Sequence, residues 1–441
     1  MEEISKYEKY KDTGIEWIGE IPENWDVKKI KHRCYVKGRV GWKGLKSSEF
    51  LTDGFSYLVT GTDFKNDTVD WDNCYHIDEE RYSEDPYIQL QNEDLLITKD
   101  GTIGKLAVVT NLDKPACLNS GIFVVRSTKD DFSTRFLLWV LKSSTFTDFN
   151  GLTAYGSTIQ HLYQNVFVEF AFAFPPVNTQ ISIADFLRKK TTEIDQIIAN
   201  KQKLIALYEE EKQAIINQAV TKGLDPNVKM KDSGVEWLGQ IPEHWKVSRL
   251  KNICSVRQGL QIPITERHFS QIEDSFEYIT IKSINNPDDT KEHILNPSGR
   301  VICEIDDILV ARTGATGEII TNVHGVFHNN FFLVDYNRSK VDRLFLIYFL
   351  KSKKIKSYLL LMAGTTTIPD LNHNAFYNTP FFEFSLNEQQ TIVSYIVEEI
   401  NRLDCIIDKF KKQIDLLQEY RTTLISEVVT GRIKVPNTIE A

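Results

Sequence analysis

The chemistry that this sequence most clearly encodes is the binding of phosphate groups by clustered basic side chains. The segment 27–48 contains no Asp or Glu, and Tyr35 and Trp42 are interleaved with its bases. Those bases are Lys28, Lys29, Lys31, Arg33, Lys37, Arg39, Lys43 and Lys46. Basic side chains bind nucleic acid largely because they release counterions from its phosphates. A solvated basic face would show the same composition, so both interpretations fit this segment alone.

A second basic segment begins the other half of the chain and favours the nucleic-acid interpretation. Residues 247–265 are also free of Asp and Glu, and their bases include Arg249, Lys251 and Arg257. Further bases lie in or just before an expected helix at 342–361, namely Arg338, Lys340, Arg343, Lys351, Lys353, Lys354 and Lys356. The net charge of −9 taken alone gives no support to DNA binding. The local distribution of charge therefore carries the argument.

Two glycine-containing loops could bring short polar side chains close to phosphates or base edges. Their sequences are KDGTIGK at 99–105 and RTGATGE at 312–318, so that Lys99 corresponds to Arg312. Glycine permits backbone conformations that approach a ligand closely. The same glycines could instead serve only the tight turns of two hairpins. Both interpretations fit the sequence.

No catalytic motif accompanies these binding features. Gly101 and Gly104 are separated by two residues, where a phosphate-binding NTPase loop has four. The metal-binding H-E-x-x-H pattern and the nucleophile pattern G-x-S-x-G are absent, and the nine histidines are dispersed. Pro175 and Pro176 lack the preceding Asn or Asp of an adenine methyltransferase motif. We therefore predict that the chain is not an enzyme and binds no metal.

Composition indicates a folded cytoplasmic protein. The chain has 441 residues, of which 41% are hydrophobic and 11% aromatic, enough for two or three domains with cores. Its cysteines form no C-x-x-C pair, which is typical of reduced thiols. No apolar run approaches the ~18–20 residues that cross a bilayer, and the polar N-terminal segment is unlike a signal peptide. We expect no membrane partner.

The elements that must position these residues occur twice. The sequence KDTGIEWIGEIPENWDVKKIK at 11–31 returns as KDSGVEWLGQIPEHWKVSRLK at 231–251. Residues 158–162 (TIQHL) likewise return as TIPDL at 367–371. The tryptophans of the repeated segment, Trp17, Trp25, Trp237 and Trp245, are predicted to be packing anchors. A repeat of this length indicates two copies of one structural unit.

Two long helices are predicted at 179–222 and 388–430, because neither segment contains Gly or Pro and apolar residues recur every three or four positions. The packing positions predicted for the first helix are Ile183, Leu187, Ile194, Ile197, Leu204, Tyr208 and Ile215. Those predicted for the second are Ile392, Ile396, Leu403, Ile406, Leu417 and Leu424. Near-heptad spacing favours a coiled coil. Because a whole module separates the helices, we expect them to pair antiparallel.

The predicted fold class is α+β. Two α/β modules are joined by the two long helices, which form an antiparallel coiled coil with a pseudo-two-fold repeat. Residues 1–174 would hold the first repeated segment and module, and 175–222 the first helix. Residues 223–382 would hold the second segment and module, and 383–441 the second helix and a tail.

In combination, these motifs resemble the specificity subunits of Type I restriction-modification systems. The residues that carry the resemblance are Gly14, Glu16, Trp17, Pro22, Trp25, Pro175, Pro176, Gln180, Ile183, Phe186, Ile194, Asp195 and Thr221. The resemblance covers both halves of the chain. One departure is that the second helix is entered through 384–389 without a Pro-Pro pair.

The resemblance implies a non-catalytic reader of double-stranded DNA. Each module would be a target-recognition domain for one half of a bipartite, asymmetric site, and the helices would set the spacer. Two methyltransferase subunits would dock on the helical frame, with S-adenosylmethionine bound to them, and methylate a flipped adenine. Restriction subunits, with ATP and Mg²⁺, would join for cleavage. No cofactor is expected on this chain.

We chose candidate DNA contacts from charge and loop position, because base readout requires side chains that face a groove. In the first module they are Arg33, Lys37, Arg39, Trp42, Lys43, Lys46, Thr60, Lys99 and Thr102. In the second they are Arg257, Gln258, Gln261, Lys282, Arg312, Thr313 and Thr316. Two other functions stay open. One is an adaptor that binds only protein through the coiled coil, and the other is an enzyme fusion, which the missing motifs disfavour.

Overall fold

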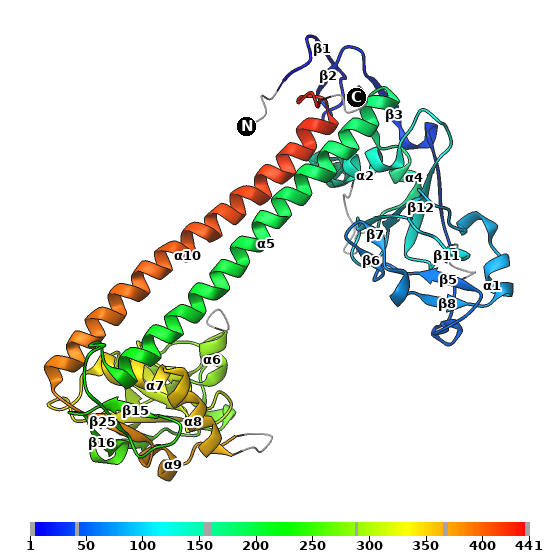
Figure 1. The fold of residues 1–441 in the computed structure, drawn as a ribbon. Coiled ribbons are helices and arrows are strands. Elements are labelled where there is room, and N and C mark those ends of the chain that lie inside the picture. The colour runs from blue at the N-terminus through cyan, green and yellow to red at the C-terminus, as the bar shows by residue number, and fades with distance from the viewer. Residues whose placement is uncertain (1–4, 40–43, 154–160, 287–289, 365–368, 437–441) are drawn as a thin grey trace. The chain divides into compact units, whose positions relative to one another are not determined.

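The structure is a computed structural model that describes residues 5–39, 44–153, 161–286, 290–364 and 369–436 (Figure 1). The chain divides into two compact units, and each unit holds one module together with one end of both long helices. Unit 1 comprises residues 1–201 and 412–441, and unit 2 comprises residues 202–411. The α+β class and the repeat are therefore confirmed. No helix in the described part of the chain is both long and apolar enough to cross a membrane.

The described part of module 1 contains a larger and a smaller sheet. The larger has the order β4-β12-β9-β10-β7-β6, formed by Cys34–Gly38, Ile122–Ser127, Leu95–Thr98, Leu106–Val108, Thr68–Val69 and Phe64–Lys65. The smaller has the order β11-β5-β8, formed by Ala116–Leu118, Ser56–Val59 and Tyr75–Ile77. Strands β9 and β12 are apolar on both faces along most of their length, because helices cover one side and the second sheet the other.

Among the described residues, module 2 repeats the central part of this topology, without counterparts of β6 and β7 and with one additional strand in its second sheet. Its first sheet has the order β17-β24-β21-β22, formed by Cys254–Gln258, Phe331–Tyr336, Leu309–Ala311 and Ile319–Ile320. Its second has the order β19-β18-β23-β20, formed by His293–Leu295, Ser275–Ile279, Gly325–Phe327 and Ile302–Cys303. β5 pairs parallel with β11 in module 1, and β18 pairs parallel with β23 in module 2. The two modules therefore share one backbone plan despite their different side chains.

Short helices follow the sheets in the same order in each module. Module 1 has α2 (Thr134–Lys142), α3 (Ser144–Thr153) and α4 (Gln164–Phe167), and module 2 has α7 (Arg343–Lys351), α8 (Lys353–Ala363) and α9 (His373–Tyr377). The single helix predicted at 342–361 was wrong, because Ser352 separates α7 from α8. Ser352 is extended (φ −62°, ψ 139°), and its hydroxyl donates to the carbonyl of Phe349. Ser143 divides α2 from α3 in the same way.

The repeated segments form small sheets that anchor each module. In unit 1 these are β1 with β2 and β3 with β13, at Tyr10–Asp12, Glu20–Pro22, Asp26–Lys29 and Ala171–Phe174. In unit 2 they are β14 with β15 and β16 with β25, at Met230–Asp232, Gln240–Pro242, Lys246–Arg249 and Pro380–Glu383. Trp25 and Trp245 are 1% and 0% exposed, which confirms their role as packing anchors.

Each repeated segment packs on the end of a long helix. α5 (Val177–Lys222) is followed by Gly223, and α10 (Leu386–Val429) is followed within two residues by Gly431. Both glycines have positive φ, 70° and 76°, as expected where a helix ends. Gly431 lies against Pro22 and Trp25, and Gly223 lies against Trp245. The first segment therefore packs on the end of the second helix, and the second segment on the end of the first.

The antiparallel pairing of α5 and α10 is confirmed by polar contacts along both helices. In unit 1, Asp195 pairs with Arg421, and Lys201 donates to Gln413 (2.6 Å). In unit 2, Lys212 donates to Asp404 (2.6 Å) and Tyr208 stacks on Phe410 at 6.0 Å. The partner numbers fall along α10 as they rise along α5. Of the predicted packing positions, the following are buried: Ile183, Leu187, Ile194, Ile392, Ile396, Leu403 and Leu424. Tyr208, Ile215, Ile406 and Leu417 are half-buried.

Two predicted packing positions were wrong. Ile197 and Leu204 are 44% and 40% exposed, whereas the neighbouring Ile198 is 8% exposed. The physical reason is that lysines occupy the seam at positions 201 and 212, where they bond across to α10. Because the prediction considered only apolar residues, it placed the face of α5 that packs against α10 one position away from its observed place in the middle of the helix, at Ile197 instead of Ile198.

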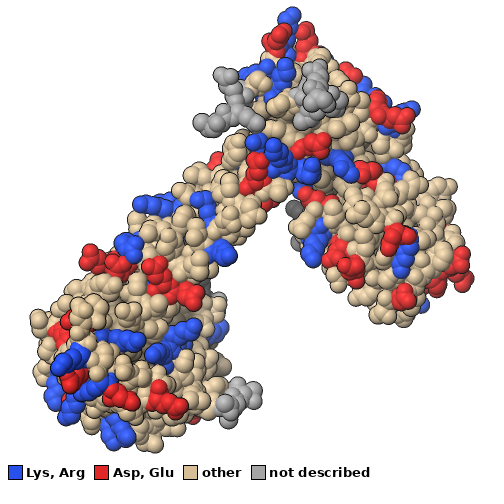
Figure 2. All heavy atoms as spheres, viewed as in Figure 1, with Lys and Arg blue, Asp and Glu red and all other residues tan. Residues whose placement is uncertain are grey.

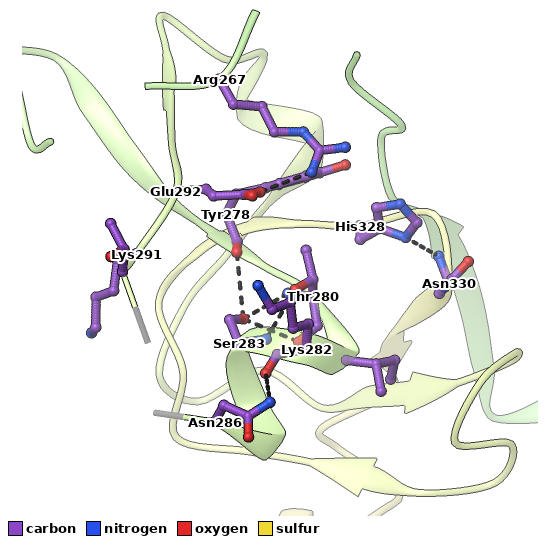
Figure 3. Close-up of a pocket in the computed structure, with 12 residues that line it drawn as sticks. Arg267, Tyr278, Thr280, Lys282, Ser283, Asn286, Lys291, Glu292, His328 and Asn330 are labelled. Carbon is purple, nitrogen blue, oxygen red and sulfur yellow. Dashed lines mark hydrogen bonds and ion pairs between the residues drawn. The ribbon is translucent and has the colours of Figure 1, made fainter. Parts of the chain in front are cut away.

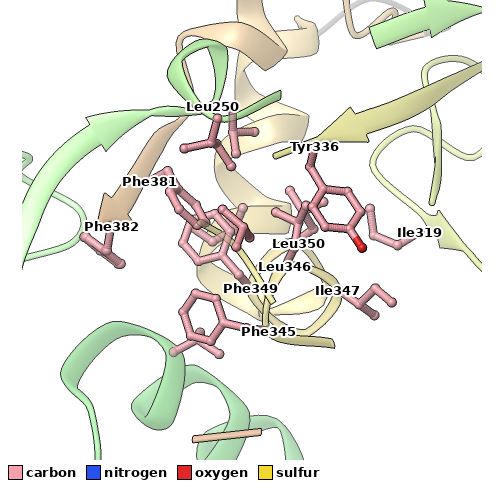
Figure 4. Close-up of a cluster of buried hydrophobic side chains, with 14 of the residues drawn as sticks. Leu250, Ile319, Tyr336, Phe345, Leu346, Ile347, Phe349, Leu350, Phe381 and Phe382 are labelled. Carbon is pink, nitrogen blue, oxygen red and sulfur yellow. The ribbon is translucent and has the colours of Figure 1, made fainter. Parts of the chain in front are cut away.

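In unit 2 a single hydrophobic core joins the module to the helical frame (Figure 4). It contains Phe345 and Phe349 from α7, Phe381 from β25, Val220 from α5 and Ile396 from α10, each no more than 1% exposed. Large buried apolar side chains are the main source of folding free energy. Because one core contains parts of all these elements, the orientation of the module on its helix ends is fixed.

Candidate nucleic-acid interface

Four loops meet at one end of the large sheet in module 1. We call them together edge 1, formed by residues 60–63, 99–105, 119–121 and 161–163. The amide of Lys99 donates to the carbonyl of Gly121 (2.9 Å), and its own carbonyl accepts from the amide of Leu162 (3.1 Å). The amide of Asn119 donates to the carbonyl of Val59 (2.9 Å), which ties in the loop at 60–63.

The corresponding loops meet in module 2. We call them edge 2, formed by residues 280–283, 312–318, 328–330 and 369–372. The amide of Arg312 donates to the carbonyl of Asn330 (2.7 Å), and its carbonyl accepts from the amide of Leu371 (2.9 Å). The amide of His328 donates to the carbonyl of Ile279 (2.9 Å). Both edges therefore have the same backbone connections.

The glycine loops of the two edges have the same conformation. Gly101 and Gly104 have φ of 70° and 83°, and the matching Gly314 and Gly317 have φ of 80° and 82°. The amides of Gly104 and Gly317 donate to the carbonyls of Thr98 and Ala311 at 2.9 and 2.8 Å. The glycines therefore do serve tight turns. Among the described residues beyond the immediate chain neighbours, no heavy atom lies within 4 Å of a Cβ built on Gly101 or Gly104, so the described part of the loop leaves room for an approaching ligand.

In edge 1, a buried carboxylate fixes the loop at 60–63. The amide and the hydroxyl of Thr60 donate to Asp63 Oδ2 at 2.6 and 3.0 Å, and the hydroxyl of Thr62 lies 2.7 Å from that of Thr60. Asp63 is 4% exposed, and its burial raises the pKa of its carboxyl group. Thr60 therefore presents a hydroxyl whose position is set by the protein before any ligand binds.

In edge 2, the corresponding loop lines a recess of about 260 Å³ (Figure 3). The hydroxyl of Thr280 accepts from the amide of Ser283 (3.0 Å), which begins the short helix α6 (Ile281–Asn285). Lys282, Asn286 and Lys291 line the recess and are exposed. On the opposite side, the ring of His328 accepts at Nδ1 from the amide of Asn330 (3.0 Å).

His328 presents a defined hydrogen-bond donor at this recess. Its burial, and secondarily the charge of Arg267, lower the pKa of the imidazole below its ordinary value, so the neutral form dominates at pH 7. Because Nδ1 accepts a hydrogen bond, the single ring proton is on Nε2. Arg267 is itself held by Glu292 (2.8 Å) and by the carbonyl of Ile262. The recess therefore offers several donors, which suits acceptor-rich base edges or phosphates.

Three basic side chains of the stretch at 27–48 are paired with acids from elsewhere in the chain. Lys29 and Lys31 both bind Glu169, at 2.9 and 2.6 Å, and they lower the pKa of its carboxyl group to about 2. Arg33 pairs with Asp131 (3.2 Å) at the end of β4 that is opposite to edge 1. On the face drawn in Figure 2, basic and acidic side chains are likewise interspersed. Although the stretch contains no Asp or Glu, the fold places acids from other segments beside some of its bases.

Several candidate contacts lie in the two edges. Edge 1 contains Thr60, Lys99 and Thr102, and edge 2 contains Lys282, Arg312 and Thr313, with Gln258 and Gln261 alongside it. Gln261 accepts from the side-chain amide of Asn329 (3.0 Å). Lys37 and Lys46 are exposed elsewhere in module 1. Trp42 and Lys43 lie outside the described residues.

Two candidate contacts are buried in this structure, and two others make internal bonds. Arg39 is 2% exposed, and its Nε donates to the carbonyl of Leu118 (2.9 Å) beneath edge 1. Thr316 is 8% exposed, and its hydroxyl donates to the carbonyl of Pro369 (2.8 Å). Neither side chain is exposed at the surface of its edge. Arg257 donates to the carbonyl of Arg300 (3.0 Å), and Arg33 to Asp131.

Sequence reasoning missed four residues of the edges. His161 Nδ1 donates to Asp100 Oδ1 (2.7 Å) in edge 1, and Asp370 accepts from Arg312 in edge 2. His328 lines the recess. A signal was available for two of them, because His161 and Asp370 occupy matching places in the repeated pentapeptides TIQHL and TIPDL.

A second exposed surface lies along the long helices. In unit 1, Ile197, Leu416 and Tyr420 are 44%, 63% and 52% exposed. In unit 2, Leu204 and Leu207 are 40% and 51% exposed. Large apolar side chains on the outer faces of a helix pair are typical of a surface that another protein covers. Within the described ranges, no three His, Cys, Asp or Glu side chains are grouped as a metal ion would require.

Comparison with known proteins identifies relatives along nearly the whole chain. The family model of the Type I restriction modification DNA specificity domain matches twice, at residues 22–207 and 242–415. The type I restriction enzyme MjaVIII specificity subunit of Methanocaldococcus jannaschii is 21% identical over 95% of each chain. The EcoBI specificity subunit of Escherichia coli is 23% identical over 73% of this chain and 69% of its own.

Solved structures show the same fold. One chain superposes with a TM-score of 0.65. It comes from a structure that concerns complex assembly and conformational transition of the type I R-M system. It is 14% identical, and the match covers 93% of this chain and 98% of that one. The HsdS subunit of Thermoanaerobacter tengcongensis superposes with a TM-score of 0.56 at 13% identity, covering 94% and 98%.

Proposed function

This chain belongs to the Type I restriction modification DNA specificity family, and we propose that edges 1 and 2 each read one half of a bipartite DNA site. It is a specificity subunit, and it is not itself an enzyme. The main support for the proposal is that the two edges have the same backbone connections but carry different side chains. Edge 1 holds Thr60, Lys99 and Thr102, whereas edge 2 holds Lys282, Arg312 and Thr313. Two edges with different side chains would read different bases, so the complete site would be asymmetric.

Base discrimination would come from donors and acceptors that the edges hold before DNA arrives. The major groove presents a distinct pattern of donors and acceptors for each base pair. The fixed hydroxyl of Thr60 and the Nε2–H of His328 suit such readout, because little further ordering is needed on binding. Exposed bases such as Lys37 and Lys282 would contact phosphates and fix the register.

The long helices would set the distance between the half-sites. Helices α5 and α10 have 46 and 44 residues, and each residue adds ~1.5 Å along the axis. In unit 2 the module and both helix ends share one core, so the edge cannot turn freely on the frame. An insertion in both helices would then lengthen the unspecified spacer rather than change the bases that are read.

Two methyltransferase subunits would dock on the helical frame. The exposed apolar side chains of α5 and α10, among them Leu207 and Leu416, are the surfaces that such partners would cover. S-adenosylmethionine would be carried by these partners, and ATP with Mg²⁺ by the restriction subunits. The partners would also share in binding the phosphates, which accounts for a DNA reader with a net charge of −9.

Binding of duplex DNA by the purified complex with its methyltransferase tests this proposal. We expect a specific duplex to bind at least ~10³-fold more tightly than a random duplex, with affinity that falls steeply as salt rises. Binding no stronger than to random DNA, with the partner present, would instead support the adaptor that binds only protein. Methyl transfer by this chain alone would support the enzyme fusion.

A further inference from the structure

We infer that Lys99 and Arg312 are positioning residues, which hold three loops of each edge together so that neighbouring side chains can discriminate bases. The inference rests on the proposed function, and it assigns these two basic residues a different role from direct contact with DNA. It concerns the matching position of both modules, which is the first residue after β9 in module 1 and after β21 in module 2.

The backbone of this position is a junction of three loops in each module. In edge 1, Lys99 bonds through its amide to the loop at 119–121 and through its carbonyl to the loop at 161–163. In edge 2, Arg312 bonds in the same way to the loops at 328–330 and 369–372. The residue itself begins the glycine loop. Its displacement would therefore move all three loops at once.

The side chain of Arg312 is committed to the same junction. Its Nε and Nη2 donate to Asp370 Oδ1 at 3.0 and 2.9 Å, and Nη2 also lies 2.8 Å from Asp370 Oδ2. The guanidinium carbon lies 5.7 Å above the ring centre of Phe332. The side chain is 22% exposed. A two-nitrogen fork onto one carboxylate fixes both distance and angle, so it locks the glycine loop to the loop at 369–372.

Module 1 forms the corresponding lock with different residues. Lys99 Nζ lies 5.3 Å above the ring centre of Phe123, which matches the place of Arg312 above Phe332. The link between the two loops is made instead by His161 and Asp100, at 2.7 Å. In module 2 the donor Arg312 lies in the glycine loop and the carboxylate of Asp370 in the loop at 369–372. In module 1 the carboxylate of Asp100 lies in the glycine loop and the donor His161 in the loop at 161–163. Both modules therefore link the same two loops, although they use different side chains to do so.

A direct contact with DNA makes the opposite prediction for Asp370. If Arg312 bound a phosphate or a guanine, Asp370 would compete with DNA for the guanidinium, and removal of its charge would leave binding unchanged or make it tighter. If Arg312 is a positioning residue, removal of Asp370 releases the loops and weakens discrimination at the half-site that edge 2 reads. Asp370→Asn is nearly isosteric and therefore separates the two cases with little risk to folding.

The test measures duplex binding by the full complex with its methyltransferase, across a salt series. Duplexes would carry the mapped site or single-base changes in either half. We expect Asp370→Asn and Arg312→Ala each to reduce discrimination at one half-site by about tenfold, with the other half-site and the salt slope unchanged. The inverted pair Arg312→Asp with Asp370→Arg should recover part of that loss, because it restores the ion pair. Asp306→Asn is the matched control, because it removes an exposed carboxylate of the same module, before the other end of β21, without breaking the fork.

Two results would overturn the inference. One is that Asp370→Asn binds the mapped site as tightly as the unchanged protein or more tightly. The other is that Arg312→Ala lowers the salt slope by about one phosphate contact and affects all sequences equally. Failure of the proposed function would look different, since the unchanged complex would then show no preference for any duplex.

Discussion

A buried glutamine at the start of each long helix should decide how firmly each module is held on the frame. Gln389 in α10 is 0% exposed, and its side-chain oxygen accepts from the amide of Asp342 (2.9 Å), the residue that caps α7. Its side-chain nitrogen donates to the carbonyls of Lys340 (2.9 Å) and Phe384 (3.3 Å). Gln180 in α5 makes the equivalent bonds, including one to the amide of Ser133 (2.9 Å).

The substitution Gln389→Leu preserves approximate volume but leaves one amide and two carbonyls, all partly buried, without these partners. A buried polar group that loses its hydrogen-bond partner costs about 1–3 kcal/mol. A carbonyl costs less than an amide, because its oxygen has two lone pairs and can keep a second hydrogen bond. Because water can still reach these groups in part, we expect a loss of about 2–4 kcal/mol in the stability of unit 2. Gln390→Leu is the matched control, because Gln390 is exposed and its replacement should change stability by less than about 0.5 kcal/mol.

Urea unfolding followed by hydrogen exchange would measure this loss in each unit separately. Amides in α7 should lose protection in the Gln389→Leu variant, while amides in α2 keep it. Gln180→Leu should show the reverse pattern. The reasoning would be refuted if Gln389→Leu and Gln390→Leu had equal midpoints and α7 kept its full protection.

Local contacts of Gly431, of Glu169 and of the Lys212–Asp404 pair each contribute to stability in a way that substitution or pH would reveal. Gly431→Ala should destabilise more than Gly223→Ala, by about 1–3 kcal/mol, because its Cβ would lie 2.5 Å from a Pro22 ring carbon, whereas that of Gly223 would meet nothing nearer than 3.5 Å; equal midpoints in thermal unfolding would contradict this. The Glu169 carboxyl, whose pKa is depressed to about 2 in the folded state, should contribute stability above its ordinary pKa that is lost as pH falls through about 2; an NMR titration with a midpoint near 4.5 would contradict it. Replacing Lys212 and Asp404 together with leucine should be neutral or stabilising, whereas Asp404→Leu alone should destabilise because it removes an acceptor of the seam lysine; equal losses in both variants would exclude this explanation.

The architecture was predictable because the two copies share the residues that make the frame. The buried Trp25 and Trp245 anchor the repeated segments. Gly223 and Gly431 follow the ends of the long helices. Gln180 and Gln389 bond each long helix to its module. Each of these roles depends on one residue type at one place, so the repeat reveals it. The strand order of the modules was not predictable, because the strands are short and apolar on both faces.

The errors have a common physical cause, which is that partners distant in sequence change what a side chain can do. Glu169 lies far from Lys29 and Lys31 in the chain and forms ion pairs with both. Arg39 belongs to the basic stretch but is buried under edge 1. The lysine at 201 belongs to the helix seam because Gln413 faces it. Local composition shows charge, but only the fold shows whether that charge is free to meet a ligand.

The junction at Lys99 and Arg312 illustrates a further limit. Its bonds to neighbouring loops are made by backbone atoms, which every residue carries, so no residue type marks them. The matching places of His161 and Asp370 in the repeat could have indicated a link, but not its partner. The sequence therefore identified the glycine loops as candidate sites without showing which residues hold them and which face outward.

The central claim is that each edge reads its own half-site independently, and a module exchange tests it most directly. Residues 27–174 would be replaced by the matching segment of another family member, with the long helices kept, and methylated adenines would be mapped across a genome that expresses the chimera with the methyltransferase. The account predicts that one half of the methylated motif changes, while the other half and the spacer stay the same. A change in both halves, or an unchanged motif, would contradict it.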